Sequence, residues 1–388
     1  MPPYPPFYGG DAIYSSHLIE ALAKAGASVA VLCQAPDRRE VPGIPETAGV
    51  TWRIVCARQR RQAASLFSTL PSLAYRFGGV KIRAALEEEL GAKDWDAILI
   101  DHIGTGWAIA PILRHYRNRT PPVLAYVSHN HEETTRYDVY RDFHGALFMK
   151  FGLFLDAIKT TRLERRVTEC VNLITVNTEE DRALFQTHKL AAHLLTLPPG
   201  YDGPVRERSP DFAEIPRRVV VLGSFNWVAK RMNLEAFLAI ASPRFEAAGA
   251  EIVVVGDMPD GYGKAIEARF GAVRAVGRVE DVYSFLRESR VGIIPEQSGG
   301  GFKHKALSYI FQRLPIACLE GSVAGLPMRA GEGILVFPDM KRLVEGVLES
   351  LDDAHLLNRL QGRAFSQCRE GFSWAERGEW LLAGLRKG

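Results

Sequence analysis

The 388-residue chain has little of several features that mark specialised classes of protein. Its five cysteines are scattered and form no Cys-x-x-Cys pair, so the sequence offers neither a disulfide framework nor a common zinc site. No apolar run approaches the roughly 18 residues of a membrane-spanning helix, and no basic-then-apolar stretch marks a signal peptide. The formal net charge of +3 is too small to indicate nucleic-acid binding. We expect a cytoplasmic protein whose membrane contact, where it has one, is peripheral on the inner face.

What the chain does have is ordinary globular composition, with 47% hydrophobic residues and a length that suits two domains. Short apolar runs, such as 123–127, 218–222 and 291–294, alternate with segments of helical periodicity. This alternation predicts an α/β fold with parallel, doubly wound sheets, in which ligands collect beyond the carboxyl ends of the strands. We place an N-terminal domain at 1–202, a linker at 203–217, a C-terminal domain at 218–370 and a terminal helix at 371–388.

The segment from Gly292 to Pro315 combines a short apolar strand, three consecutive glycines and a helical stretch. A helix N-terminus carries free backbone N–H groups, and glycines before it keep side chains out of the way. Lys303 and Lys305 flank this point. The pattern predicts an anion site, most naturally for a diphosphate, and a tight turn without a ligand is the alternative. It matches neither Gly-x-Gly-x-x-Gly nor a P-loop.

Titratable residues follow the predicted strand 123–127, in a Ser-His-Asn-His-Glu-Glu stretch. Three interpretations stay open. As a metal site, the stretch lacks the spacing of the common zinc motif on a helix. As a helix start, Ser128 or Asn130 would be the cap and the glutamates would suit the positive end. As a substrate site, His129 and His131 lie at the carboxyl end of a strand, where a ligand could bind.

Residues 57–83 interleave basic side chains with apolar and aromatic ones. Such a pattern suits contact with anionic lipid headgroups and the shallow acyl region of a membrane. A single amphipathic helix that packs on its own domain explains the same residues.

The glycine segment resembles the donor-site loop of GT-B glycosyltransferases, in particular the retaining family 4. Many members carry three glycines, a basic residue, a lysine two positions later and a helix that ends shortly before proline. Lys303, Lys305 and Pro315 match this pattern. In the family the helix ends in Gly-x-Pro, and Arg313 takes the place of that glycine here. The order of elements resembles the family over nearly the whole chain.

The sequence departs from the family pattern at several positions. The usual pair of glutamates is replaced by Gly300 and Ser308, and Ser224 stands where relatives carry an arginine that grips the diphosphate. Glu296 could stand in for one carboxylate, and an exposed loop glutamate is the alternative. The strand that precedes the double glycine at 9–10 in relatives is missing, which predicts either an upstream start or a sheet that is one strand short.

The resemblance implies two Rossmann-like domains facing a cleft, with the C-terminal helix crossing back to the N-terminal domain. It also implies retaining transfer of a sugar from a nucleotide diphosphate donor to a glycan, polysaccharide-precursor or lipid-linked acceptor. No metal or other cofactor is expected, since lysines neutralise the departing diphosphate. The alternatives are a degenerate GT-B scaffold or binding protein and a GT-B sugar phosphorylase or epimerase.

The candidate site residues follow from these segments and from the resemblance. The expected catalytic residues are His129, His131 and Lys303. The residues expected at the donor are Gly9, Gly10, Lys230, Arg231, Gly277, Arg278, Glu296, Gly299, Gly300, Gly301, Lys305 and Ser308.

Overall fold

The computed structural model describes residues 3, 9–35, 44, 46–188, 190–296 and 301–387, which form two compact units. The first unit comprises Met1–Gly200, Gly300–Phe302 and Ser373–Gly388, and the second comprises Tyr201–Gly299 and Lys303–Phe372. Residues 201–217, which include the predicted linker, contain no helix or strand. Two of the candidate glycines, Gly299 and Gly300, lie outside the described residues.

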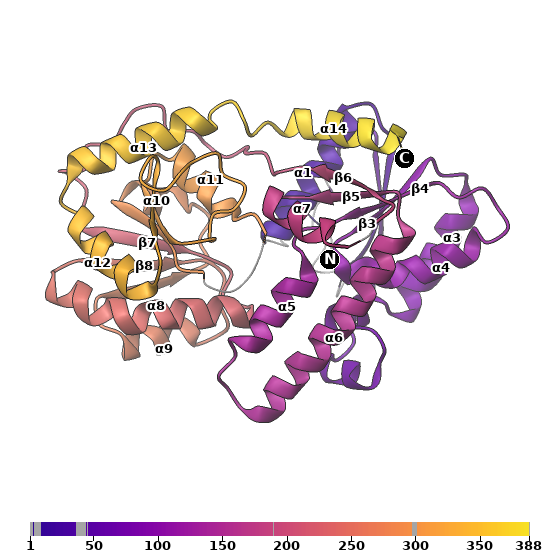
Figure 1. Cartoon of the computed structure of the whole chain (residues 1–388), viewed down its shortest axis with the longest axis horizontal. Coiled ribbons are helices and arrows are strands. Elements are labelled where there is room, and N and C mark those ends of the chain that lie inside the picture. The colour runs from indigo at the N-terminus through magenta and orange to yellow at the C-terminus, as the bar shows by residue number, and fades with distance from the viewer. Residues whose placement is uncertain are drawn as a thin grey trace. The chain divides into compact units, whose positions relative to one another are not determined.

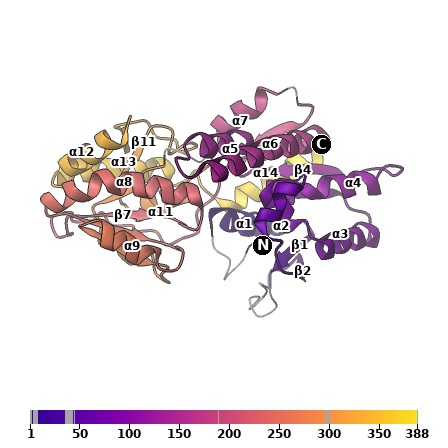
Figure 2. The same cartoon turned by 90° about the horizontal axis from the view of Figure 1, so that it is seen from below.

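The first unit contains two parallel sheets, one of β1–β2 and one in the order β3-β4-β5-β6. α3 packs on the β1–β2 pair (Figure 2). In the described part of the chain, no strand precedes α1. The elements are α1(Gly10–Lys24), β1(Val29–Ala35), β2(Val50–Cys56), the 3-10 helix η2(Gln62–Phe67), α2(Ser72–Phe77), α3(Val80–Ala92), β3(Ala97–Asp101), η3(Ile103–Ala108), α4(Ile109–His115), β4(Val123–Val127), α5(Glu132–Arg141), α6(Leu147–Cys170), β5(Leu173–Val176), α7(Glu179–Gln186), β6(His193–Thr196) and α14(Trp374–Lys387).

Helices cover both faces of the four-stranded sheet, as expected when strands are apolar on both sides. On one face, side chains of η3, α4 and α6 form a core with alternate residues of β3, β4 and β5. On the other face, α1 and α14 pack together over the remaining strand residues. Gly378 of α14 makes this approach possible, because a Cβ atom there would lie 2.1 Å from the Ala21 carbonyl oxygen of α1. The C-terminal helix is therefore part of the first unit.

The second unit is built on a six-stranded parallel sheet in the order β12-β11-β10-β7-β8-β9. The side chains of β7, β8 and β10 are almost all fully buried, and α8 and α12 pack on one face of the sheet (Figure 1). The elements are β7(Arg218–Leu222), α8(Val228–Ala247), β8(Glu251–Val255), α9(Tyr262–Arg269), β9(Val273–Gly277), α10(Tyr283–Arg287), β10(Val291–Ile294), α11(His304–Phe311), β11(Ile316–Leu319), β12(Ile334–Phe337), α12(Met340–Ser350) and α13(Ala354–Cys368).

Residues 57–83 do not form an amphipathic helix, so that part of the interpretation is wrong, but part of the segment does pack on its own domain, with Ala74 and Ile82 in the core. The segment divides into η2, α2 and the start of α3. Pro71 lies just before α2 with φ −63°, and Gly78 follows its last residue. Proline has no backbone N–H and two successive glycines disfavour helix, so the chain breaks at both places. Among the described helices, none has the length and apolarity to span a membrane.

Candidate active site

The carboxyl ends of β3 and β4 bring Asp101 and His129 together in the first unit. Asp101 is the last residue of β3 and is in register with Val127, the last residue of β4. The turn after β4 then places His129 Nε2 at 2.7 Å from Asp101 Oδ1. From α1, the Ser15 hydroxyl donates to the second oxygen of Asp101 at 2.6 Å. Three elements therefore converge on one carboxylate.

This contact sets the charge of the buried His129. Burial by itself lowers the pKa of His129, but the Asp101 carboxylate, helped by Asp11, outweighs burial and raises it to about 10. In turn, burial favours a raised pKa for Asp101, and the imidazolium of His129 holds it below its ordinary value. His129 is thus a cation at neutral pH, suited to donate a hydrogen bond rather than to accept a proton as a general base.

Further charged groups surround the pair. The backbone of His102 has a φ of 65°, which is uncommon for a residue other than glycine. Its Nδ1 accepts from the Gly104 N–H at 3.0 Å. Its Nε2 lies 3.4 Å from Glu132 Oε1 and 3.9 Å from Asp11 Oδ2. Asp11, in the first turn of α1, also lies 3.6 Å from His129 Nδ1. A substrate at this edge of the sheet would meet two imidazoles bracketed by three carboxylates.

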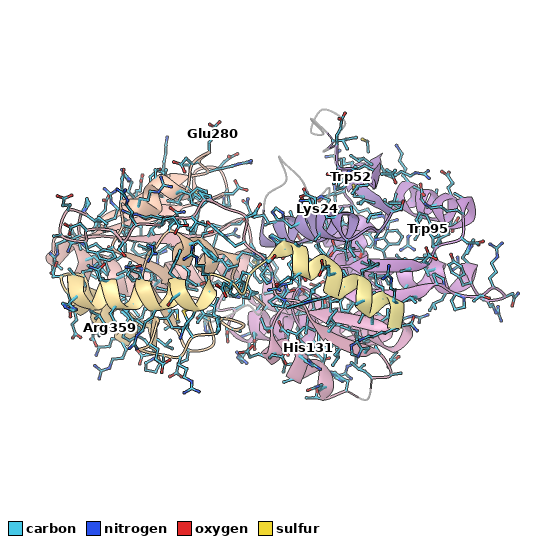
Figure 3. The ribbon with its side chains drawn as sticks, turned by 90° about the horizontal axis from the view of Figure 1, so that it is seen from above. Lys24, Trp52, Trp95, His131, Glu280 and Arg359 are labelled. Carbon is cyan, nitrogen blue, oxygen red and sulfur yellow. The ribbon has the colours of Figure 1, made fainter. Side chains whose placement is uncertain are left out.

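His131, the other candidate histidine, is labelled in Figure 3, and its neighbours differ from those of His129. It precedes α5 as its N-cap, with Nδ1 2.8 Å from the Thr134 hydroxyl, and its ring contacts Phe185 edge-on with centroids 4.7 Å apart. Burial lowers its pKa to about 4, so it is neutral at pH 7. His129 rather than His131 therefore joins Asp101. A helix does start at this point, but its N-cap is His131, so the expectation that Ser128 or Asn130 is the cap is wrong.

Among the residues that the structure describes, one group has the composition of a metal site: His131, Glu133 and His188. Their ligand atoms all lie within 4.8 Å of one another. However, Arg165 donates to both oxygens of Glu133, at 2.8 and 3.1 Å. A divalent cation would have to displace this guanidinium, and the expectation of a metal-independent reaction stays a prediction.

In the second unit, three lysines gather around Glu296, which directly follows Pro295 and β10. Glu296 Oε1 accepts from Lys230 Nζ at 2.9 Å and from Lys305 Nζ at 2.5 Å. Lys305 also donates to the Leu222 carbonyl oxygen at the end of β7, at 2.9 Å. Glu296 is buried, so it is not an exposed loop glutamate. Its other oxygen, Oε2, is buried without a hydrogen-bond partner among the described residues.

The charges in this cluster are strongly coupled. Burial favours a raised pKa for Glu296, but Lys230, Lys305 and Lys303 together hold it well below its ordinary value. Burial lowers the pKa of Lys305 to about 8, with Glu296 opposing the shift. Lys230 and Lys305 share the single carboxylate of Glu296, so these three side chains together carry a net positive charge beside α11. Lys303, the N-cap residue of α11, is itself buried.

Other candidate donor residues of this unit take several positions. Arg231 donates from one guanidinium nitrogen to the Phe225 and Asn226 carbonyl oxygens, at 2.8 and 2.9 Å, so it braces the loop between β7 and α8. Gly277 ends β9 with φ 78°, a conformation that favours glycine, and Arg278 follows it on the surface. Ser308 is half-buried in the second turn of α11.

The remaining candidate glycines belong to the first unit. Gly9 is the N-cap of α1 and Gly10 its first residue, so both lie one turn or less from Asp11. Gly301 has a φ of 73°. Sequence reasoning did not select Asp101, Asp11 or Ser15, although Asp101 could have been found as the carboxylate that closes a predicted strand.

Residues 216–353 match the family model described as glycosyl transferases group 1, and residues 9–200 match the model described as glycosyl transferase 4-like domain. No curated protein matches the chain.

Several solved structures share its fold. A sucrose-phosphate synthase from Thermosynechococcus elongatus is 18% identical with a TM-score of 0.70, over 98% of this chain and 93% of that one. Anabaena HepE in complex with UDP-glucose is 12% identical with a TM-score of 0.68, over 98% and 97%. WaaG, a glycosyltransferase involved in lipopolysaccharide biosynthesis, is 14% identical with a TM-score of 0.67, over 98% and 97%.

The two family matches together span most of both units, and the similar structures extend over nearly the whole chain. The predicted α/β fold with parallel sheets is therefore confirmed, and so is the resemblance drawn from the glycine segment. The chain belongs to the group 1 glycosyltransferases of the GT-B fold, enzymes that take a sugar from a nucleotide-sugar donor.

Proposed function

We propose that the second unit holds the nucleoside diphosphate of the donor at the start of α11, and that the first unit holds a glycan, polysaccharide-precursor or lipid-linked acceptor. Transfer then proceeds with retention at the anomeric carbon. The observation that carries this proposal is the buried cluster of Lys230, Lys305 and Glu296.

The cluster suits a diphosphate leaving group. Glu296 fixes both ammonium groups through one oxygen, so the cations are already oriented before the donor arrives. Fixed cations in a dry site stabilise the charge that develops as the sugar departs, by about 3 kcal/mol for one such donor. Glu296 Oε2 is the acceptor that we assign to a donor hydroxyl, since it is buried and lacks a hydrogen-bond partner among the described residues. Lysines in this arrangement do the work that a metal ion does elsewhere.

On the acceptor side, His129 is the residue that we assign to a substrate hydroxyl. Its Nε2–H is committed to Asp101. The second N–H of the imidazolium, at Nδ1, faces Asp11 Oδ1 at 3.6 Å, and Asp11 helps to raise the pKa of His129. A substrate hydroxyl or a developing negative charge that approaches this N–H would take the place of Asp11 as its acceptor.

The donor proposal is tested by thermal unfolding with UDP, GDP, ADP and dTDP. Because Anabaena HepE was solved with UDP-glucose, UDP is the first nucleotide to try. A nucleotide at 100 times its dissociation constant adds about 2.7 kcal/mol to the free energy of unfolding. We expect one nucleotide to do so in the wild type and not in Lys305→Ala.

The matched control is Lys264→Ala, which removes an exposed lysine of α9 in the same unit. It should respond to the nucleotide as the wild type does. No shift with any nucleotide, together with no turnover of any nucleotide sugar, would contradict the proposal and favour a binding protein built on the same fold.

A lipid-linked acceptor would bring the enzyme to a membrane surface. Residues 57–83 support this part of the proposal, because they contain arginine, lysine and aromatic residues and no aspartate or glutamate. The contact is peripheral, through side chains at the surface of the first unit.

A further inference from the structure

Six large apolar side chains of the first unit are exposed to solvent at the start of α6 and at the end of η2. Phe67 is 96% exposed, Leu147 85%, Phe148 78% and Phe151 61%. Single exposed hydrophobic residues are normal, but a run of them on one helix end marks an interaction surface. We call this set the apolar tip; it consists of Leu66, Phe67, Leu147, Phe148, Met149 and Phe151.

The two parts of the apolar tip are fixed to each other through α6. The Lys159 ammonium donates to the carbonyl oxygens of Ser65 and Leu66, at 2.8 and 3.2 Å. One turn earlier, Asp156 accepts from the Ser72 N–H at 2.6 Å. Leu147 lies 12 residues before Lys159, which is about 18 Å along the helix axis. Figure 1 shows the start of α6 and the 62–77 region at the same end of the first unit.

The sequence around the apolar tip is mainly basic. Neither 57–83 nor 143–155 contains an aspartate or glutamate, and the two acidic residues that flank the second range already have partners: Asp142 pairs with Arg141, and Asp156 accepts from the Ser72 N–H. Arg58 and Arg61 are exposed, and Lys150 lies 5.6 Å from the centre of the Tyr140 ring. None of these three cations forms an ion pair within the described ranges, unlike Arg53, which binds both Glu88 and Glu89. Unpaired cations beside apolar side chains attract an anionic surface that also has an apolar interior.

A second copy of the chain is a poor occupant of this surface. Symmetric pairing would bring the same unpaired cations face to face, and like charges across an interface are unfavourable. An anionic bilayer satisfies both features, because phosphates neutralise the cations while acyl chains receive the side chains.

We infer that the apolar tip inserts into the headgroup and upper acyl region of an anionic bilayer, with Arg58, Arg61 and Lys150 contacting lipid phosphates. The inference deepens the proposed peripheral contact and rests on that part of the proposed function. It adds the start of α6, which lies more than 60 residues beyond the basic segment in the sequence. The first unit then meets the membrane through the end of its longest described helix.

The experiment is co-sedimentation of the full chain with vesicles of phosphatidylcholine alone or mixed with phosphatidylglycerol. We expect binding to the mixed vesicles that weakens with salt. The variant Phe67→Ser/Phe148→Ser should bind about tenfold more weakly or worse, since it loses two exposed aromatic side chains that would enter the bilayer. The variant Arg58→Gln/Arg61→Gln should bind more weakly and with less salt dependence. Val205→Ser, which removes an exposed apolar side chain in the second unit, is the matched control and should bind as the wild type does.

The nucleotide response of each variant, measured by thermal unfolding, shows that the chain is folded and separates the two proposals. Vesicle binding without any nucleotide response would leave the docking inference standing while the donor proposal fails. Unchanged binding of the double phenylalanine variant would overturn the inference, and so would a wild-type dimer that this variant dissociates and that ignores vesicles.

Discussion

Replacement of Asp101 by asparagine tests the charge state of His129 directly. Asparagine keeps the shape of the side chain and can still accept from Ser15, but the negative charge that raises the pKa of His129 to about 10 is gone. Burial is then opposed by Asp11 alone, so the pKa of His129 falls well below its wild-type value. The variant therefore loses the imidazolium proton at a lower pH than the wild type does.

The effect on stability follows from the same pair. Breaking a buried ion pair costs about 3–5 kcal/mol. The side chain of Asp101 is 41% exposed, however, so solvent screens part of the attraction. We therefore expect a loss of about 1–3 kcal/mol at pH 6. Because the folded pKa of His129 lies above its unfolded value, this contribution is fully present below about pH 6.5 and is lost as pH rises through about 10.

The assay is urea unfolding followed by circular dichroism at several pH values, with NMR titration of the histidine ring resonances. The difference between wild type and Asp101→Asn should shrink steadily as the pH rises from about 6.5 to about 10. Asp94→Asn, which alters an exposed carboxylate before β3, should show no such dependence. A constant difference across this range, or a wild-type His129 that titrates near 6.5, would refute the ion-pair argument.

Two further predictions concern the donor site and the packing of the C-terminal helix. Burial lowers the pKa of Lys305 to about 8. The affinity for UDP should therefore fall as pH rises through 8, approaching about tenfold per pH unit above it, and calorimetric titration of the wild type with the same affinity at pH 7 and pH 9 would contradict this. Gly378→Ala should destabilise the chain by about 1–3 kcal/mol, because its Cβ atom would overlap the Ala21 carbonyl. Gly362→Ala, with nothing within 4 Å of the new atom, should instead stabilise α13 by about 0.5–1 kcal/mol; equal effects of the two alanines in urea unfolding would contradict the packing argument.

The fold could be predicted at most of the strands that are uninterrupted apolar runs. Residues 123–127, 218–222 and 291–294 coincide with β4, β7 and β10, because parallel strands covered on both faces leave no room for polar side chains. β2, β6 and β11 were not predicted. β2 and β6 are at least partly exposed, and both carry polar residues such as Arg53 and His193, so their pattern resembles a surface segment. β11 (Ile316–Leu319) is a buried apolar run of only four residues directly after Pro315, and the sequence reasoning overlooked it.

The sequence predicted some residues of the candidate site but not their partners. His129 was found because it follows a strand, and Lys303 and Lys305 because they follow glycines. The partners of these residues come from distant segments: Ser15 is 86 residues from Asp101, and Lys230 is 66 residues from Glu296. Local pattern carries no information about such pairings, so the choice between His129 and His131 and the burial of Glu296 needed the structure.

The membership of α14 in the first unit has a consequence for the order in which the chain folds. α14 covers α1 through Gly378 and Leu381, and Arg377 donates to the Pro198 carbonyl oxygen at 2.7 Å. On the ribosome, these contacts cannot form until residues 201–372 and then α14 have been synthesised. Synthesis of residues 201–372 takes on the order of 10 to 30 s. The unit that begins first thus finishes last, and the apolar face of α1 stays open to chaperones while the second unit is already able to fold.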